Sequence, residues 1–223
     1  MDADHLAALR RSYARAGLDE ADLAADPLTQ LRRWLDDTVN AELPEPNAMV
    51  VATADVAGRP TARYVLLKGL DERGVVFYTN HNSAKGADLD ANPYASVLFP
   101  WHALERQVRV TGPVCRVSGD ETAAYFASRP RGSQLGAWAS SQSEPAASRA
   151  ELDAAYAETE RRWQLEAAVP VPAFWGGYRV RIHTAEFWQG RENRLHDRLR
   201  YVRVSQDIES QDIGEWRVER LWP

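Results

Sequence analysis

The sequence predicts a mainly β fold: an antiparallel, Greek-key-like barrel, closed or half-closed, with flanking helices. Short β-rich runs separated by Gly, Asn and Pro fill residues 48–117, and similar runs return between residues 177 and 221. Strands do not alternate with helices and no glycine fingerprint follows the first strand, which argues against a Rossmann fold. The 223 residues contain no linker long or polar enough to divide them. We therefore expect one domain, with a helical segment over residues 1–45 and the barrel over residues 46–223.

The N-terminal segment is expected to be helical. Asp26 and Pro27 combine an N-cap residue with a proline at the first helical position, which predicts a helix of about four turns. The apolar stripe of this helix would consist of Leu28, Leu31, Leu35 and Val39. An earlier helix is indicated by the helical spacing of Leu6, Leu9 and Tyr13.

The remaining elements follow from changes in periodicity and from turn residues. Residues 56–60 read as a hairpin turn, and Arg129-Pro130 should stop a helix. Strands are expected over residues 48–54, 61–70, 74–80, 94–99, 104–117, 177–183, 186–189, 198–204 and 216–221. Helices are expected over residues 119–128 and 148–165, with a short one opening at Ser83.

Composition excludes several classes of protein. Lys and Arg number 27 against 32 Asp and Glu, a net charge of −5, which argues against a nucleic-acid binder. No apolar run approaches the roughly 20 residues of a membrane helix, and the acidic start is unlike a secretory signal. The single Cys115 can form no internal disulfide, and the histidines lack metal-ligand spacing. We expect a cytoplasmic protein that binds no metal, nucleic acid or membrane.

Two cations stand within a strand that should be mostly buried. Arg63 and Lys68 flank three apolar residues. A buried cation is costly unless it meets an anion, so this strand should face either a negative ligand or a buried carboxylate. Their odd separation puts the two side chains on opposite faces, unless a bulge or the strand end intervenes.

A possible phosphate cradle opens the short helix after residue 80. Ser83 is a suitable N-cap, free N–H groups follow it, and Lys85 lies in the first turn. The alternative is an ordinary capped helix on the surface.

A second possible anion site lies at the end of the helix over residues 119–128. Tyr125 and Arg129 are four residues apart and so share a helix face, and Ser133 follows the Pro130 break. A guanidinium, a phenol and a hydroxyl suit a phosphate. The alternative is an arginine that caps the carbonyl groups of its own helix.

The densest polar cluster covers residues 188–198. If its last part is extended, Arg194, His196 and Arg198 alternate onto one face, after Trp188 and a glycine turn. Such a set suits an anionic aromatic ligand, and the nearby cations should lower the pKa of His196. The alternative is a salt-bridged edge strand.

Taken in order, these segments resemble the pyridoxamine (pyridoxine) 5′-phosphate oxidase family, which has the FMN-binding split-barrel fold. The resemblance extends from about Leu9 to Pro223. It is specific because several motifs of the family occur together and in the same order. They include Arg63-Tyr64-Val65-Leu66-Leu67-Lys68, Gln134-Leu135-Gly136-Ala137-Trp138, Phe174-Trp175-Gly176-Gly177 and Arg194-Leu195-His196-Asp197-Arg198.

The resemblance implies an enzyme that oxidises pyridoxamine or pyridoxine 5′-phosphate to pyridoxal 5′-phosphate with FMN and O₂, releasing H₂O₂ and, from the amine, ammonia. It also implies a homodimer with FMN in a groove between subunits. The residues implied at FMN are Arg63, Tyr64, Val65, Leu66, Leu67, Lys68, Tyr78, Thr79, Lys85, Gln107, Gln142, Ser143, Trp188 and Arg198. Those implied at the substrate are Lys68, Tyr125, Arg129 and Ser133 for its phosphate, Arg194, Leu195 and His196 at the pyridine ring, and Arg10 and Tyr13 in a closing segment. Arg194 and His196 are the implied catalytic residues.

The sequence departs from the family pattern in two places. Ala84 stands where the family commonly has arginine, and residues 205–214 form a longer stretch, read as a solvated hairpin loop. Two other functions remain open: a split-barrel oxidoreductase with other substrates, using flavin or deazaflavin, and a non-catalytic protein that binds flavin or pyridoxal phosphate. The substrate-side residues argue against the first of these, whereas the second would use the same binding residues.

Overall fold

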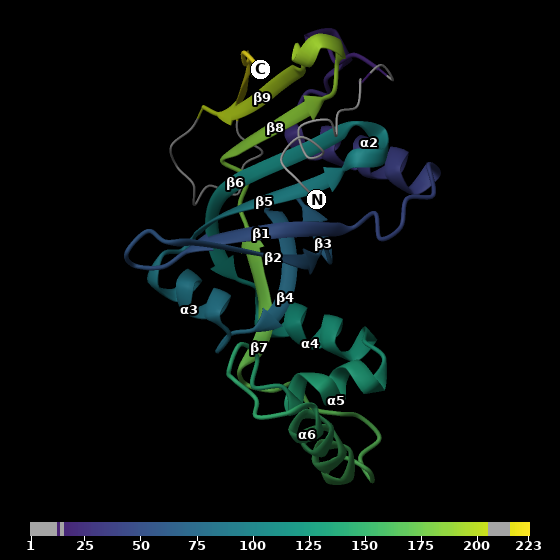
Figure 1. Cartoon of the computed structure of the whole chain (residues 1–223), viewed down its shortest axis with the longest axis vertical. Helices are drawn as coiled ribbons and strands as arrows, with labels where there is room; N and C mark the ends of the chain where they lie inside the picture. The colour runs from purple at the N-terminus through teal and green to yellow at the C-terminus, as the bar shows by residue number, and fades with distance from the viewer. Residues whose placement is uncertain (1–12, 14–15, 205–214) are drawn as a thin grey trace, which may run out of the picture.

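The computed structural model describes residue 13, residues 16–204 and residues 215–223. Its centre is a curled antiparallel sheet with flanking helices, which confirms the predicted split-barrel class (Figure 1). The strands are β1 (Ala48–Ala54), β2 (Pro60–Leu66), β3 (Gly69–Asp71), β4 (Gly74–Asn80), β5 (Tyr94–Trp101), β6 (Arg106–Arg116), β7 (Trp175–Val180), β8 (Thr184–Gln189), β9 (Asp197–Arg203) and β10 (Trp216–Arg220). The helices are α2 (Pro27–Asn40), α3 (Ala84–Ala91), α4 (Gly119–Ser128), α5 (Arg131–Ala139) and α6 (Arg149–Arg162), with short 3₁₀ turns η1 (Glu20–Asp22), η2 (His102–Leu104) and η3 (Glu192–Arg194).

The sheet divides along β6. Residues 106–111 of this strand pair with β8, whereas residues 114–116 pair with β7, which in turn pairs with β4. Gly112 lies between the two stretches, and a Cβ there would come within 1.7 Å of the carbonyl oxygen of Arg181. Only glycine therefore lets the chain pass from β7 to β8 so close to β6.

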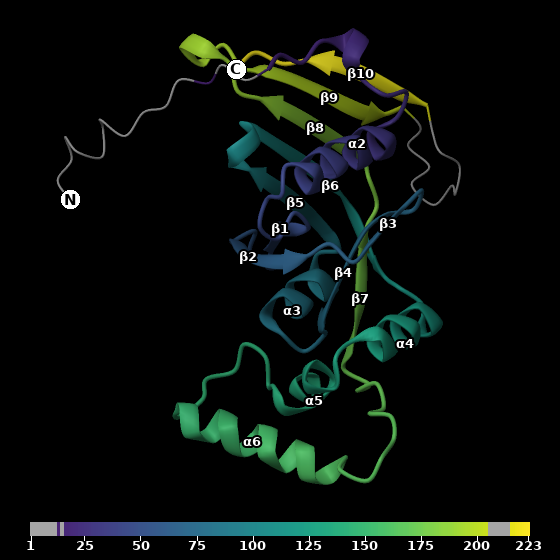
Figure 2. The same cartoon turned by 90° about the vertical axis from the view of Figure 1, so that its right-hand side faces the viewer.

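The main core lies between the curled sheet and α2, which Figure 2 shows lying across β6 and β8. Trp34 of α2 meets Phe187 of β8 edge to face, with ring centroids 5.2 Å apart. A smaller core lies under α4 and α5, farther along the molecule. It consists of Phe126, Leu135, Ala137, Val169 and Trp175.

The start of α2 is as predicted, but its buried face is rotated. Asp26 accepts a hydrogen bond from the Thr29 N–H at 2.8 Å, and Pro27 follows it. Two residues of the predicted stripe face the core, since Leu31 is buried and Leu35 packs against it, whereas Val39 is 54% exposed and the large ring of Trp34 is buried against the sheet instead. Thr38 is also buried, and its hydroxyl is not left without a partner, because it donates a hydrogen bond to the Trp34 carbonyl.

The strand predicted over residues 61–70 is wrong in extent and burial. It ends at Leu66, and β3 begins only at Gly69. Most of β2 is exposed because it is an edge strand that pairs with β1 alone among the described strands. Only Leu67, just beyond its end, is fully buried.

Helix α5 was not predicted, because Pro130 reads as a helix breaker and Gly132 and Gly136 weaken helical propensity. In the structure Pro130 instead occupies the N-cap position of this helix. The other boundaries differ by a few residues: α6 ends at Arg162, and β7 and β8 each begin two residues early.

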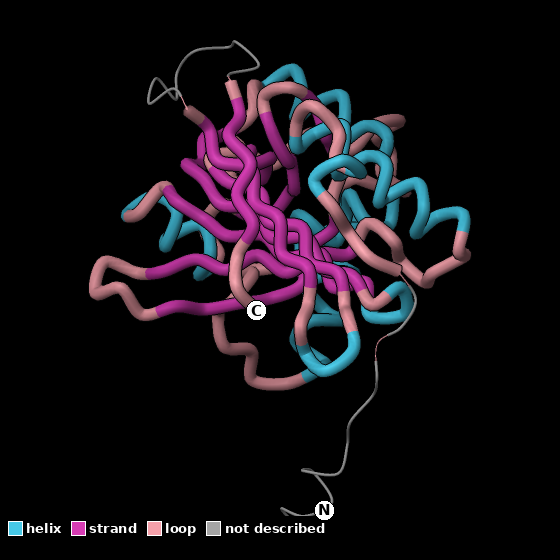
Figure 3. Tube along the Cα trace, turned by 90° about the horizontal axis from the view of Figure 1, so that it is seen from above, coloured by secondary structure: helices cyan, strands magenta, loops and turns pink. Residues whose placement is uncertain are grey.

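The tube view in Figure 3 shows the strands gathered in the middle, with helices around them. Within the described part of the chain, no helix is both long and apolar enough to cross a membrane. Leu6, Leu9 and Arg10 of the first expected helix, and the loop at residues 205–214, lie outside the described residues.

Candidate cofactor and substrate site

One pocket of about 690 Å³ collects most of the residues expected to bind ligands, and its size suits a small-molecule site. Its lining comes from the end of β2, from β4 and β7, and from α3, α4 and α5. The lining residues are Arg63, Tyr64, Val65, Leu66, Lys68, Tyr78, Thr79, Asn80, Ala84, Lys85, Tyr125, Arg129, Ser133, Gly136, Ala137, Ser140, Gln142, Ser143 and Trp175.

Arg63 and Lys68 both line this pocket, although a continuous strand would separate them. The strand ends at Leu66, so the regular alternation of faces stops before Lys68 is reached. Of the six residues from Arg63 to Lys68, Leu67 alone is absent from the lining, because it is buried in the main core.

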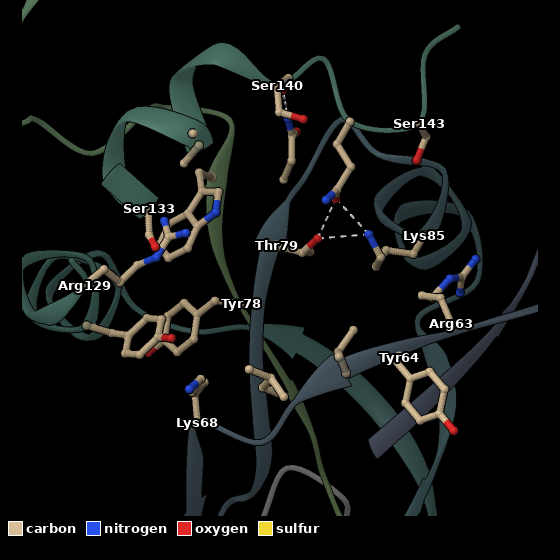
Figure 4. A pocket seen from close by; sticks show the side chains of 18 of the residues that line it. Arg63, Tyr64, Lys68, Tyr78, Thr79, Lys85, Arg129, Ser133, Ser140 and Ser143 are labelled. Atoms are coloured by element: carbon tan, nitrogen blue, oxygen red, sulfur yellow. Dashed lines mark hydrogen bonds between the residues drawn. The ribbon is translucent and has the colours of Figure 1, made fainter. Parts of the chain in front are cut away.

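Lys85 forms the cationic centre of one end of the pocket (Figure 4). It is only 7% exposed, and its Nζ donates to three uncharged oxygens: Thr79 Oγ1 at 3.0 Å, Ser83 Oγ at 3.2 Å and Gln142 Oε1 at 2.8 Å. Burial, and then repulsion by Arg63, lowers the pKa of Lys85 from 10.5 to about 8. A desolvated ammonium group whose described hydrogen-bond partners are all neutral is a suitable counter-charge for an anion.

The start of α3 adds to this end of the pocket. Ser83 caps the helix by accepting from the Gly86 N–H at 3.4 Å, and the Ala84 N–H donates to Ser143 Oγ at 3.2 Å. Arg63 donates to Thr53 Oγ1 at 2.7 Å and lies 3.9 Å from Asp88. The predicted cradle is therefore lined by two cations and a helix N-terminus rather than being a plain surface helix.

Arg129 and Ser133 lie at the other end of the pocket (Figure 4), and Tyr125, which lines the pocket and stacks on Tyr78, completes the second predicted set. Arg129 Nη1 is buried and has no hydrogen-bond partner among the described residues. The guanidinium lies over the ring of Trp175, 4.6 Å from its centroid. An unpaired buried N–H of a cation indicates a place for an anionic ligand, and it disfavours the alternative in which this arginine caps its own helix.

Several lining residues were not predicted. Gly136, Ala137 and Ser140 belong to α5 or its end, and that helix was missed. Asn80 directly follows the predicted residues Tyr78 and Thr79, and Trp175 is part of the motif Phe174-Trp175-Gly176-Gly177. These positions were the only signs in the sequence that the two residues belong to the site.

The remaining predicted residues gather elsewhere, on β6, β8 and β9. Gln107, Trp188 and Arg198 lie directly opposite one another across these three strands and so share one sheet face. Arg198 Nε donates to Glu186 at 2.8 Å, and its Nη1 donates to the Trp222 carbonyl at 2.9 Å. None of these residues lines the pocket described above.

His196 lies beside Trp188, with ring centroids 4.6 Å apart. Its Nδ1 accepts a hydrogen bond from the Arg191 N–H at 3.1 Å, so the proton of the neutral ring is on Nε2. Burial first, and then the charge of Arg194, lowers the pKa of His196, whereas Asp197 opposes the shift. The predicted direction is confirmed, but the main cause is loss of solvent.

The expected alternation of Arg194, His196 and Arg198 along one strand is wrong. Strand β9 begins only at Asp197, and Arg194 lies in the turn η3 with a left-handed backbone (φ 63°). Arg194 and Leu195 are exposed on this turn. The turn, rather than strand pleating, therefore decides where the Arg194 side chain points.

Tyr13 lies against the same group of residues. Its ring centroid is 5.8 Å from those of Trp188 and His196, in edge-to-face contact with both. A Cβ on Gly190 would come within 2.7 Å of the Tyr13 ring, so this glycine makes the approach possible. Arg10 lies outside the described residues.

The single chain thus places the predicted site residues in two separate groups. We call the predicted residues that line the pocket the pocket group. The second group, which we call the sheet group, consists of Tyr13, Gln107, Trp188, Arg194, Leu195, His196 and Arg198. Figures 1 and 2 agree that β8 and β9 lie at the opposite end of the molecule from α5.

Known proteins match this chain over nearly its whole length. The family profile described as pyridoxamine 5′-phosphate oxidase matches residues 35–162, and the profile described as pyridoxine 5′-phosphate oxidase C-terminal dimerisation region matches residues 175–223. A pyridoxine/pyridoxamine 5′-phosphate oxidase of Streptomyces avermitilis is 57% identical and covers 97% of this chain and 96% of its own. The protein of the same name from Rubrobacter xylanophilus is 58% identical and covers 98% of this chain and 96% of its own.

Solved structures show the same fold. PhzG from Burkholderia lata, in complex with tetrahydrophenazine-1-carboxylic acid, has a TM-score of 0.84 and 31% identity, covering 96% of this chain and all (100%) of its own. A pyridoxamine 5′-phosphate oxidase-related, FMN-binding protein from Nostoc punctiforme has a TM-score of 0.70 at 17% identity, covering 90% of this chain and 100% of its own. The second likeness concerns the fold alone.

Proposed function

Because the chain belongs to the pyridoxamine 5′-phosphate oxidase family, we propose that it oxidises pyridoxamine and pyridoxine 5′-phosphate to pyridoxal 5′-phosphate with FMN and O₂, releasing H₂O₂ and, from the amine, ammonia. The observation that supports this most is the pocket with a cationic site at each end. Lys85 is buried among neutral oxygens at one end, and Arg129 has an unpaired N–H at the other. Two separate anion sites suit a cofactor and a substrate that each carry a phosphate.

FMN fits the first end. Its phosphate would lie against Lys85, Arg63 and the N-terminal end of α3, since the positive end of a helix and two cations favour a dianion. Thr79, Gln142 and Ser143 surround the same place, and Tyr64, Val65 and Leu66 would border the rest of the cofactor. When bound, FMN supplies the redox chemistry, accepting a hydride from the substrate and passing the electrons to O₂.

The chain's own residues bind and orient the substrate. Tyr125, Arg129, Ser133 and Lys68 would hold its phosphate, and the stacked rings of Tyr78 and Tyr125, 4.0 Å apart, wall that end of the pocket. Arg194 and a neutral His196 would lie at the pyridine ring, where His196 can donate from Nε2. Fixed orientation of the reacting groups lowers the barrier to hydride transfer.

We propose a homodimer in which the sheet group of one protomer completes the pocket group of its partner at FMN. The support is that one chain holds both groups but keeps them apart, and that residues 175–223, which match a dimerisation-region profile, include most of the sheet group. Gln107, Trp188 and Arg198 would then contact FMN from across the interface.

An assay of H₂O₂ release tests this function. The purified protein, loaded with FMN, should release H₂O₂ with pyridoxine 5′-phosphate and elute as a dimer containing one FMN per chain. FMN binding without turnover would indicate a binding protein, and turnover only with unrelated substrates would indicate another split-barrel oxidoreductase. A colourless monomer that takes up no FMN would contradict the proposal altogether.

FMN binding should weaken as the pH rises above about 8. The pKa of Lys85 is about 8 in the free protein, and the phosphate of bound FMN would raise it, so binding takes up a proton above that pH. The Kd for FMN should therefore increase by up to about tenfold per pH unit above about 8. Flavin fluorescence titrations at several pH values measure this.

Lys85→Arg is the matched control for the pH dependence, because arginine remains charged throughout the range. Its FMN affinity should show a flatter pH profile than that of the unmodified protein. Identical profiles in the two proteins would show that Lys85 does not bind the FMN phosphate.

The substitution Ala84→Arg should tighten FMN binding. Ala84 lines the pocket at the start of α3, beside Lys85, so a longer cationic side chain there could reach the phosphate. A charge-assisted hydrogen bond contributes about 1.5–3 kcal/mol, but fixing the arginine opposes it by up to about 2 kcal/mol, leaving a gain of roughly a few-fold in Kd. Ala84→Gln, which adds length without charge, is the control. An unchanged or weaker Kd in the arginine variant would mean that another group already fills this position.

A further inference from the structure

Trp175, the first residue of β7, lies beneath the substrate-phosphate end of the pocket. We propose that Trp175 is a positioning residue that holds the Arg129 guanidinium in place for the phosphate, and so contributes to selection of phosphorylated over unphosphorylated substrates. This inference rests on the proposed function, because it deepens the role of the same pocket.

The contacts of Arg129 support this role. Its guanidinium carbon lies 4.6 Å from the centroid of the Trp175 ring and 5.5 Å from that of Phe126. The buried Nη1 has no hydrogen-bond partner among the described residues. Aromatic faces therefore hold the cation while leaving hydrogen-bond donors unused, which suits a group that must bind a ligand.

Trp175 is itself held by neighbouring rings. It stacks on Tyr78 with centroids 5.5 Å apart at 16°, and the Tyr125 ring is nearly parallel at 6.1 Å and 9°. Phe126 meets it edge to face at 5.0 Å. The exposed fraction of Trp175 is only 7%, so the ring has little freedom to leave Arg129.

The N-terminal end of α4 is held by β7, the strand that also carries Trp175. Glu121, in the first turn of α4, pairs with Arg179 of β7 at 2.6 Å, and its carbonyl accepts a hydrogen bond from the Tyr78 hydroxyl at 3.3 Å. Residues 175 and 179 are four apart on β7 and so point to the same side of it. One face of β7 thus anchors both ends of the helix that carries Tyr125 and Arg129.

The test measures binding, so it does not depend on turnover. The ligands are 4′-deoxypyridoxine 5′-phosphate, which has no group to oxidise, and its unphosphorylated form, each titrated into the FMN-loaded protein. In Trp175→Leu the Kd for the phosphorylated ligand should rise about tenfold, equivalent to about 1.4 kcal/mol. The affinity for the unphosphorylated ligand should stay unchanged, and Trp175→Phe should recover most of the loss.

Trp138→Leu is the matched control. Trp138 packs against the same small core and also lies under an arginine, Arg162, at 5.2 Å, but it does not line the pocket. This variant should bind both ligands as the unmodified protein does. FMN content and the unfolding temperature, measured for every variant, show whether each one is folded.

The outcomes separate this inference from the proposed function. Equal weakening toward both ligands in Trp175→Leu, or no weakening, would overturn the positioning role even if the unmodified protein is an active oxidase. Selective weakening in a protein that oxidises nothing would support the positioning role while contradicting the oxidase. A folded Trp175→Phe that behaves like Trp175→Leu would show that an aromatic face is not what matters. A parent protein that binds neither ligand would overturn both proposals.

Discussion

Replacing Arg129 by alanine should raise the KM for pyridoxine 5′-phosphate by about ten- to hundredfold, because a charge-assisted hydrogen bond to a phosphate contributes about 1.5–3 kcal/mol. The guanidinium has a buried donor unpaired in the described structure, so the alanine variant loses an interaction that forms only with ligand. FMN retention should be unchanged, since the cations at the other end of the pocket remain. Steady-state kinetics and flavin absorbance measure the two quantities separately.

Arg129→Lys is the informative companion variant. It keeps the charge but loses the flat surface that lies over Trp175 and the forked donors, so KM should fall between the values of the parent and alanine forms. Loss of FMN with an unchanged KM in Arg129→Ala would reverse the assignment of the two ends of the pocket.

Replacing Arg194 by alanine should lower turnover at least about tenfold, because losing about 1.4 kcal/mol of contact in the transition state has that effect. Arg194 belongs to the left-handed turn before β9, near His196, and does not line the pocket of its own chain. FMN content should therefore remain near normal. Stopped-flow reduction of the bound flavin gives the rate of the affected step.

Arg191→Ala is the control for Arg194. Arg191 belongs to the same turn region and pairs with Asp197 at 3.1 Å, while its contribution to His196 comes from the backbone N–H, which alanine retains. This variant should keep turnover close to that of the parent. Normal turnover in Arg194→Ala would show that the role assigned to this residue is wrong.

The local part of the site could be read from the sequence. The N-caps at Asp26 and Ser83 and the shared face of Tyr125 and Arg129 depend on contacts within one or two helical turns, and all three appear as expected. Short-range periodicity encodes such features directly.

Features that depend on distant contacts could not be read in this way. Trp175 reaches Arg129 only because β7 pairs with β4 and brings the strand under α4, and neither residue carries a local sign of the other. The burial of Leu67 likewise depends on distant contacts, because β2 ends at Leu66 and the next residue enters the main core. The division into a pocket group and a sheet group follows from the topology of the sheet, which no single stretch of sequence contains.

The division of the sheet along β6 has a consequence for how the protein unfolds. One part of this strand pairs with β8, which carries Trp188, and the other part pairs with β7, which carries Trp175. Both branches are held by this one continuous strand, and β5 pairs with it along residues 106–113, so the two branches share a common support. Cooperative units of this kind open together. We therefore expect the indoles of Trp188 and Trp175 to report a single thermal transition, although they stand in different halves of the site.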